Sequence, residues 1–252
     1  MLLLDADSQC NLSMFFFGED ANIFSYEEGG AQIRSDITTL YHVLEEGENI
    51  FNAIYKSRHY SVRRKLQSKF RKYDFDIDIL LGSSGMDTVE VQDADYLSRP
   101  LSKLEDEYDF ILIDFPPSFT DLITVYMVAC DYILVPAKLG ETTSIAGYFD
   151  VIKKVAGVNS SMLNENLRVL GMFYTMAMDY KRNQKSQYSE SLENQESFSL
   201  FHTYIHTDYA ANVLSDSTGD PFVICAPQST CTKDYMRLTN ELIERLGGEI
   251  NG

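Results

Sequence analysis

The sequence has 252 residues, 44% of them hydrophobic, and a formal net charge of −17 at pH 7. This length and hydrophobic content suffice for a sizeable core, and the sequence has no repeat or linker, so we expect one domain over residues 1–252. The charge excludes a surface that is basic throughout, as in proteins that coat DNA. No apolar run approaches the ~20 residues of a membrane span. No basic region precedes the short apolar run at residues 1–4, so we expect a cytoplasmic protein without a signal peptide or a membrane contact.

The predicted elements of the first half begin with a strand at residues 1–5. A helix or loop follows at 11–17, then an acidic, glycine-containing loop at 19–35. Ser35 or Asp36 can cap a helix that ends near Gly47. Beyond a short segment at 50–55 and a basic stretch, we expect a strand at 77–81, a turn at 82–85, a helix at 93–107 and a strand at 110–113.

The second half continues the alternation of helices and strands. We expect helices at 119–130 and from Thr142 or Thr143 to about 155, strands at 131–136 and 168–176, and a polar, helical segment at 181–196. A weak extended segment near 205, a strand at 221–225 and an amphipathic helix at 232–246, stopped by Gly247, complete the chain. This order predicts the α/β class, with a mostly parallel sheet flanked by helices and right-handed crossovers.

The four cysteines (Cys10, Cys130, Cys225 and Cys231) form no C-x-x-C pair. This spacing argues against a zinc site, and we expect reduced, mostly buried thiols.

The stretch YDFILIDFPPS at residues 108–118 carries the first functional signal. Its apolar run, Phe110 to Ile113, predicts a strand buried on both faces, and Pro116 and Pro117 forbid its continuation. Asp114 therefore ends the strand at the edge where open α/β sheets bind their ligands. A Walker B strand has this form, and its aspartate holds Mg²⁺ beside a nucleoside triphosphate. The alternative is a solvated acid that ends a core strand.

A second stretch, LLLDADSQCNLS at residues 2–13, repeats the design of an apolar run followed by acids. DADSQCNLS resembles the D-x-D-P-Q-x-N-L-T segment of the ParA family of partition ATPases, which have a deviant Walker A motif. LIDFPPS resembles the family's Walker B segment, and residues 131–147 resemble the D-x-x-x-V-P-x…E…G segment that follows it. The similarity runs to about residue 246. It implies a P-loop NTPase-like fold of the ParA/MinD type.

The resemblance assigns roles to several residues. Asp5 and Asp114 would face one Mg²⁺, mostly through water, and Asp7 would orient the water that attacks ATP; the alternative for Asp7 is a turn acid. Thr175 and Pro227 match positions that border the adenine in relatives, with strand-end packing as the alternative. Ser8 and Cys10 stand where the family has proline and usually glycine.

The family's K-G-G-x-G-K-[ST] loop, which cradles the phosphates, is not found in this sequence. Gly29-Gly30 and LGSSG at 81–85 lack its lysine and its strand-loop-helix setting. The chain starts within what the resemblance makes the second strand. We therefore expect either an N-terminally truncated product or a paralogue that lost its first strand and phosphate loop. Loss of that strand would expose apolar edges on its neighbours.

Residues 56–72 hold eight cations and no acid, in an otherwise acidic protein. They form either a solvated helix face or a contact for DNA or an acidic partner, with Arg63, Arg64 and Lys65 as candidates. Arg182 matches a basic position in a family region associated with DNA binding.

The resemblance implies an ATPase of plasmid or chromosome partitioning. ATP and Mg²⁺ would close a homodimer that binds nonspecific DNA, and a ParB-like centromere-binding protein would stimulate hydrolysis at the nucleoid. The alternative is a non-catalytic relative that binds a protein partner without ATP turnover. A MinD-like membrane regulator is disfavoured, because the tail ERLGGEING offers no basic amphipathic helix.

Overall fold

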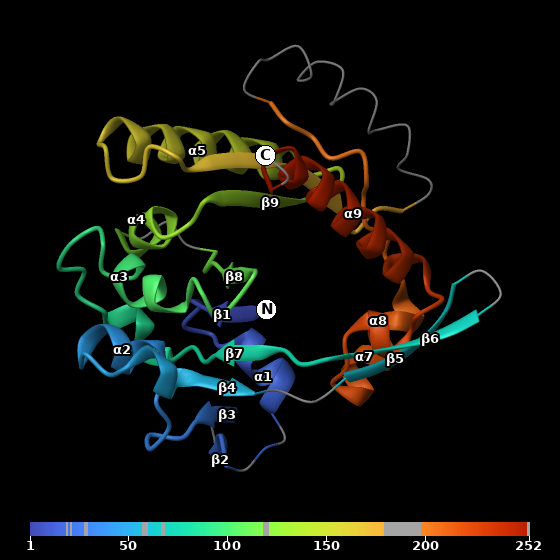
Figure 1. Ribbon diagram of the computed structural model, residues 1–252, viewed down its shortest axis with the longest axis horizontal. Helices are drawn as coiled ribbons and strands as arrows, with labels where there is room; N and C mark the ends of the chain where they lie inside the picture. The colour runs from blue at the N-terminus through green and yellow to red at the C-terminus, as the bar shows by residue number, and fades with distance from the viewer. Residues whose placement is uncertain are drawn as a thin grey trace. The chain divides into compact units, whose positions relative to one another are not determined.

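The structure is a computed structural model that describes residues 1–18, 20, 22–27, 30–56, 60–66, 69–117, 121–178 and 198–250. It contains two compact units, Met1–Ala129 and Cys130–Gly252 (Figure 1). A single domain over the whole chain stays a prediction. No helix in the described ranges is long and apolar enough to cross a membrane.

A four-stranded sheet forms the centre of the first unit, in the order β4-β7-β1-β8. Strands β1 (Leu2–Asp5), β7 (Asp78–Leu80) and β8 (Ile111–Asp114) are parallel, and β4 (Ile54–Lys56) pairs with β7 in the antiparallel direction. Helices accompany this sheet, so the predicted α/β class with a mostly parallel sheet is confirmed.

The core strands β1 and β7 follow the predicted apolar runs, and Leu2, Leu4 and Ile79 are fully buried. The prediction that β8 is buried on both faces was wrong. Phe110, just before β8, is 41% exposed and Leu112 is 48% exposed. In the described part of the chain β8 pairs only with β1, so it is an edge strand and lacks the cover of a central strand.

Short helices and two hairpins complete the first unit. They are α1 (Asn11–Phe17), α2 (Leu40–Glu45), α3 (Ser98–Leu101), α4 (Asp121–Val128), the 3₁₀ turns η1 (Ile50–Ala53), η2 (Ser84–Thr88) and η3 (Ser102–Leu104), the pair β2 (Phe24–Glu27) and β3 (Gly30–Ile33), and the pair β5 (Tyr60–Leu66) and β6 (Lys69–Phe75).

Four further predictions in this unit were wrong. The 19–35 loop contains the β2–β3 hairpin, and the 56–72 stretch is not a helix face, because β5 and β6 pair there. Residues 93–107 contain only the short helices α3 and η3. Pro100 within α3 has no backbone N–H to donate the hydrogen bond that a longer helix would need at this position. Helix α2 is capped by Thr39 rather than by Ser35 or Asp36.

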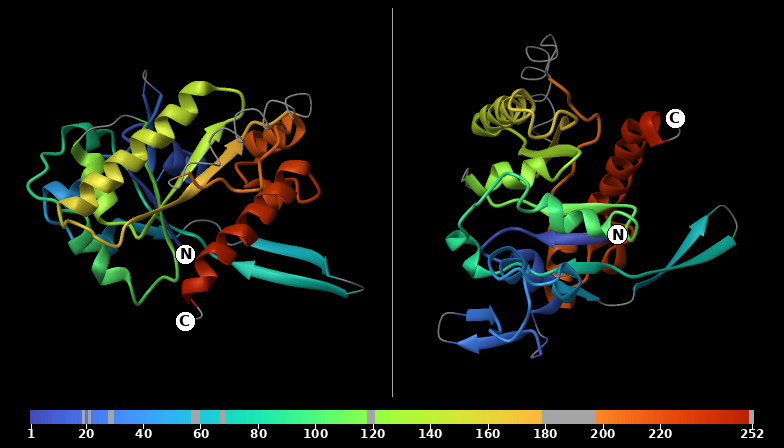
Figure 2. Two further views of the ribbon diagram at one scale, coloured as in Figure 1. Left: turned by 90° about the horizontal axis from the view of Figure 1, so that it is seen from above. Right: turned by 60° about the vertical axis from the view of Figure 1, so that its left-hand side comes forward.

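The second unit is built on two parallel strands, β9 (Tyr132–Lys138) and β10 (Arg168–Thr175). Helix α5 (Thr142–Ser160) connects them and packs Tyr148, which is fully buried, against Met172 and Tyr174 of β10. The helices α7 (Tyr209–Thr218), α8 (Phe222–Cys225) and α9 (Thr230–Ile250) follow (Figure 2).

Three predictions for the second unit were wrong. Residues 222–225 form helix α8 instead of a strand, because an apolar run of four or five residues fits either structure. Gly247 lies inside α9 and does not stop it. Glu141, not a threonine, is the N-cap of α5. The predicted helix at 181–196 lies outside the described residues.

Candidate functional site

Three acidic residues lie at the carboxyl edge of the β1–β8 pair. Asp5 and Asp114 are direct partners in the parallel register, and the backbone N–H of Ala6 donates to the carbonyl of Asp114 at 3.1 Å. Asp7 is two residues beyond β1, and after desolvation its charge is a further cause of the raised pKa of both other acids. The structure therefore brings together the three acids that the sequence singled out.

Asp5 is fully buried and holds the start of helix α1. Its Oδ2 accepts hydrogen bonds from the backbone N–H of Ser13 at 2.8 Å and from the hydroxyl of Ser13 at 2.7 Å. Its Oδ1 accepts a longer bond, 3.3 Å, from the N–H of Asp7. Since the first N–H groups of a helix have no partner within the helix, Asp5 acts as a remote cap. Both of its oxygens are thus engaged within the protein.

The hydroxyl of Ser13 extends this network to the loop after β7. It accepts a hydrogen bond from the N–H of Gly82 at 3.1 Å. A Cβ atom on Gly82 would lie 2.9 Å from the carbonyl oxygen of Asp5, a distance that real Cβ atoms essentially never show, and 3.0 Å from its Cγ, which is a tight contact. Neither Ser13 nor Gly82 was predicted from the sequence as a functional residue. The place of Ser13 in the DADSQCNLS segment could have indicated its role, whereas Gly82 was recognised only as part of the turn at 82–85.

We expect Gly82→Ala to destabilise the first unit by about 1–3 kcal/mol, because the new methyl group overlaps the backbone of buried Asp5. Chemical denaturation followed by circular dichroism measures the change. Gly147→Ala in α5 is the control, since its Cβ meets nothing within 4 Å. Alanine there should be neutral or stabilising by up to ~1 kcal/mol. Equal stability of the two variants would contradict the close approach.

The electrostatics of the three acids favour a cation. Desolvation is the main cause that raises the pKa of Asp114, followed by the negative charges of Asp5 and Asp7. Desolvation also dominates at Asp5, where the hydrogen bonds from Ser13 oppose the rise in pKa and the charge of Asp7 adds to it. A bound divalent cation would relieve this repulsion.

The donor set fits a water-bridged Mg²⁺ better than a fully liganded one. In the described part of the chain no three His, Cys, Asp or Glu side chains are arranged to hold a metal on their own. Mg²⁺ usually keeps several waters and takes one or two carboxylates. Asp114 is an exposed residue, whereas both oxygens of Asp5 already accept hydrogen bonds, so Asp114 fits a direct ligand and Asp5 a supporting charge.

Asp7 also shapes the loop that follows β1. Its Oδ1 accepts a hydrogen bond from the N–H of Gln9 at 3.0 Å, which leaves the other carboxylate oxygen for a ligand or water. Cys10, at the N-cap of α1, adopts the left-handed conformation with φ 54°. The family's usual glycine at this position would adopt it without strain. Burial, followed by the charges of Asp5 and Asp7, raises the pKa of Cys10 to about 12, so its thiol is inert near neutral pH.

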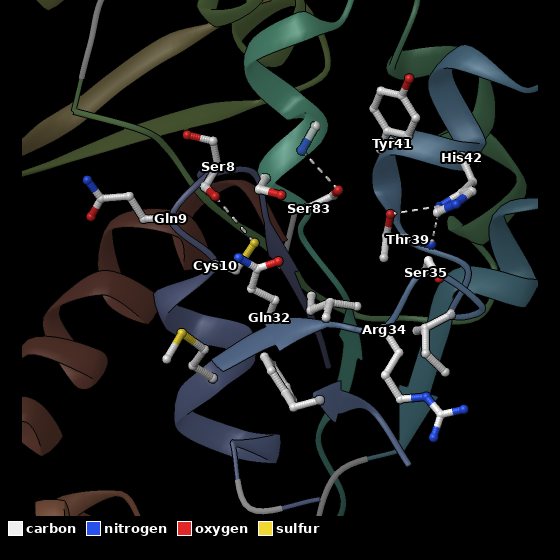
Figure 3. A pocket seen from close by; sticks show the side chains of 16 residues that line it. Ser8, Gln9, Cys10, Gln32, Arg34, Ser35, Thr39, Tyr41, His42 and Ser83 are labelled. Atoms are coloured by element: carbon white, nitrogen blue, oxygen red, sulfur yellow. Dashed lines mark hydrogen bonds between the residues drawn. The ribbon is translucent and has the colours of Figure 1, made fainter. Parts of the chain in front are cut away.

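A pocket of about 330 Å³ opens beside the same loop (Figure 3). Ser8–Cys10 after β1 and Ser83–Gly85 after β7 form one part of its lining. Met14 of α1, Phe24 of β2 and the segment from β3 to α2 form the rest. Thr39 and His42 in this segment cap α2, with Nδ1 of His42 accepting from the N–H of Thr39 at 3.1 Å. None of the residues that line the pocket is acidic. This is the edge of a parallel sheet where ligands bind.

The remaining candidates lie elsewhere in the chain. Thr175 ends β10 in the second unit, and its hydroxyl donates a long hydrogen bond, 3.4 Å, to the carbonyl of Ala137. Pro227, in the same unit, is exposed after α8. Arg63, Arg64 and Lys65 are on strand β5 of the first unit. Arg182 lies outside the described residues.

The family is shown by a model described as AAA domain (AAA_31), which matches residues 1–169. The chain belongs to this family. Two relatives place it among the ParA proteins. A virulence plasmid ParA family protein, pGP5-D of Chlamydia psittaci, is 26% identical over 252 residues, covering 98% of this chain and 83% of the relative. A ParA family protein of Chlamydia trachomatis serovar D is 26% identical over 175 residues, 66% of each chain. The match thus spans just under two thirds of that relative.

Solved structures of other proteins share the fold. The ATP complex of an McdA variant from Cyanothece has a TM-score of 0.68 at 16% identity, covering 96% of this chain and 84% of its own. Cobyrinic acid a,c-diamide synthase from Mycobacterium smegmatis, with a bound ATP analogue and magnesium, has a TM-score of 0.67 at 17% identity, covering 96% and 81%. The predicted ParA/MinD type of α/β fold is confirmed.

Proposed function

We propose that this ParA-family chain acts in plasmid or chromosome partitioning as an ATPase that depends on Mg²⁺. The observation that carries the proposal is the register of Asp5 and Asp114 at the carboxyl edge of adjacent parallel strands, with Asp7 beside them. Family membership and the partition proteins among its relatives support it. By the same resemblance, ATP would close a homodimer in the cytoplasm. The dimer would bind nonspecific DNA at the nucleoid, and a ParB-like protein would stimulate ATP hydrolysis.

In this proposal each acid has a separate task. Asp114 holds Mg²⁺ directly or through water. The negative charge of buried Asp5 attracts the cation, and its carboxylate holds the start of α1 through the N–H of Ser13. Asp7 accepts a hydrogen bond from the attacking water and so orients it. When bound, Mg²⁺ would neutralise the charge that develops on the phosphates. Thr175 and Pro227 are proposed to border the adenine.

The test compares the chain with a fusion that adds a relative's first strand and K-G-G-x-G-K-[ST] loop before Met1. We expect the chain alone to bind ATP very weakly and not to hydrolyse it, because it has no lysine loop to hold the phosphates. The fusion should bind Mg·ATP and hydrolyse it. Asp114→Asn in the fusion should lower turnover by roughly 100-fold or more, the size of a lost electrostatic contact in the transition state.

Asp109→Asn provides the matched control, since Asp109 is exposed and lies before β8. Its turnover should equal that of the fusion. A fusion that binds no nucleotide would refute the ATPase proposal, and tight Mg²⁺-dependent binding of ATP by the chain alone would refute the need for the added loop.

A second candidate is a protein-binding relative without ATP turnover. The observation that favours it is the engagement of both Asp5 oxygens within the protein, which gives this acid a structural task that needs no metal. Co-purification of a partner in equal amounts with Mg·ATP and with EDTA would support this candidate. A partner retained only with Mg·ATP would support the ATPase instead.

A further inference from the structure

The pocket of about 330 Å³ beside the Ser8–Cys10 loop has no part in the proposed ATPase. It belongs wholly to the first unit, because its lining comes from residues 8–42 and 83–85. Its volume is at the lower end of the range for small-molecule sites, about 300–1,000 Å³. Strands β1 and β7 are parallel neighbours, and the loops after their carboxyl ends line the pocket, at the edge where open α/β sheets bind ligands. Size and position therefore fit a small molecule.

The lining offers little charge with which a ligand could pair. It contains no acid, and the guanidinium of Arg34, its one Lys or Arg side chain, already makes bidentate contacts of 2.9 Å and 2.7 Å with Asp36. In Figure 3 this guanidinium points away from Ser8. The imidazole of His42 is neutral, because its Nδ1 accepts from the N–H of Thr39 and so carries no proton. A charged ligand would lose its hydration here without gaining a counter-charge, which favours an uncharged ligand.

Most of the polar side chains in the lining are hydroxyls. They belong to Ser8, Ser35, Thr39, Tyr41, Ser83 and Ser84. A hydroxyl can donate and accept at the same time, so it matches the hydroxyls of a ligand in either direction. The Oγ of Ser83 accepts from the N–H of Gly85 at 3.1 Å, which leaves its O–H to donate. This polar lining suits a ligand with several hydroxyls of its own.

Apolar side chains form the rest of the lining, and Phe24 among them is only 1% exposed. They are Met14, Phe24, Ile33 and Ile37. The C–H groups on the faces of a sugar ring can contact such side chains while the hydroxyls at the edge of the ring bind the serines. We propose that the pocket binds an uncharged sugar ring, either as a free monosaccharide or as the ribose of a nucleoside. This site goes beyond the proposed ATPase, since it needs neither Mg·ATP nor the acids of β1 and β8.

The experiment titrates the full chain with glucose and with uridine, without ATP, and follows binding by saturation-transfer NMR of the ligand. The test variant Gln32→Trp fills the pocket from β3, where Gln32 is exposed and an aromatic residue suits a strand. Binding should weaken roughly 10-fold or more, because the indole takes up the volume that the sugar would occupy. A second variant, Ser84→Ala, removes one hydroxyl and should weaken binding about 2- to 10-fold. The control Gln92→Trp makes the same substitution as the test variant at an exposed position outside the lining, and it should keep the affinity of the unmodified chain.

Binding of either uncharged ligand supports the proposal, and the tighter of the two identifies the source of the sugar ring. Glucose 6-phosphate should bind at least about 10-fold more weakly than glucose, because the pocket gives its charge no partner. Equal or tighter binding of this phosphate would overturn the proposal in favour of an anion site. Absence of binding by both glucose and uridine would also overturn it, as would equal affinities of Gln32→Trp and Gln92→Trp. If circular dichroism shows Gln32→Trp unfolded, Ser84→Ala decides. Because no ATP is present, none of these outcomes depends on the proposed ATPase.

Discussion

Replacing Asp5 with alanine is expected to lower the free energy of unfolding of the Met1–Ala129 unit by about 3 to 5 kcal/mol. The substitution removes a charged acceptor from the N–H and hydroxyl of Ser13, and each such bond contributes about 1.5–3 kcal/mol. It also leaves the first turn of α1 without its remote cap. Chemical denaturation measures the loss, and amide hydrogen exchange of β1 and α1 would locate it.

The variant Asp5→Asn keeps the shape of this side chain and removes its charge, so it separates the effects of shape and charge on stability. The amide keeps one oxygen for Ser13 but turns an NH₂ group toward the N–H of Asp7, so we expect an intermediate loss of about 1–2 kcal/mol. Asp109→Ala, an exposed acid of the same unit, should change stability by less than about 0.5 kcal/mol. An Asp5→Ala variant as stable as this control would contradict the capping role.

The pH dependence of the Asp5 contribution has a definite sign. Burial raises the pKa of Asp5 above 3.8 in the folded chain, so the stabilising contribution of this carboxyl is full below pH 3.8. It is lost as the pH rises through the raised pKa. Since asparagine does not titrate, the stability difference between the unmodified chain and Asp5→Asn should shrink as the pH rises over this window. A difference that grows instead would contradict the raised pKa.

Glu241→Gln is expected to destabilise the second unit by about 3 kcal/mol at pH 7. Burial alone would raise the pKa of Glu241, but the N–H groups of His202 and Thr203 donate to it and lower its pKa from 4.5 to about 2. These bonds measure 2.8 Å and 2.9 Å, and the side chain is only 15% exposed. Each pKa unit corresponds to about 1.4 kcal/mol, which sets the size of the effect.

The stabilising charge of Glu241 should disappear in acid. Because its folded pKa is lowered, the contribution is present above pH 4.5 and is lost as the pH falls toward about 2. Denaturation at pH 7 and in this acidic window would show a difference between the unmodified chain and Glu241→Gln that narrows with acid. Glu244→Gln, exposed on the same helix, is the control. A loss at Glu244 as large as at Glu241 would contradict this account.

The sequence predicted the sheet of the first unit and its acids because each signal there is local. An apolar run of β-forming residues ends at Asp5 and another ends at Asp114, so a strand end and a functional position coincide. Parallel pairing then follows from the alternation with helices. The hydrogen bonds that these residues make could not be predicted. The bond from Ser13 to Asp5 and the bond from Gly82 to Ser13 depend on how β1 and β7 pair, which no local pattern encodes.

The errors have a common physical origin in short or unpatterned segments. In the sequence of the β5–β6 hairpin, the alternation of polar and apolar residues by which a strand is recognised is broken by the consecutive cations Arg63–Lys65 and Arg71–Lys72. The apolar run at 222–225 is too short to distinguish a strand from the helix it forms. Gly247 continues α9 because the loss of helix propensity, about 1 kcal/mol, does not outweigh the packing of a 21-residue helix.

The left-handed backbone at Cys10 limits which amino acids evolution can use at this position. A left-handed conformation costs a residue with a Cβ atom about 1–2 kcal/mol, which glycine avoids and asparagine or aspartate partly offsets. A mutation from cysteine to glycine therefore relieves strain, whereas valine or isoleucine would add the crowding of a branched Cβ. Substitution of Cys10 by glycine is therefore favoured by the backbone and substitution by a β-branched residue is disfavoured, even though the side chain itself is buried.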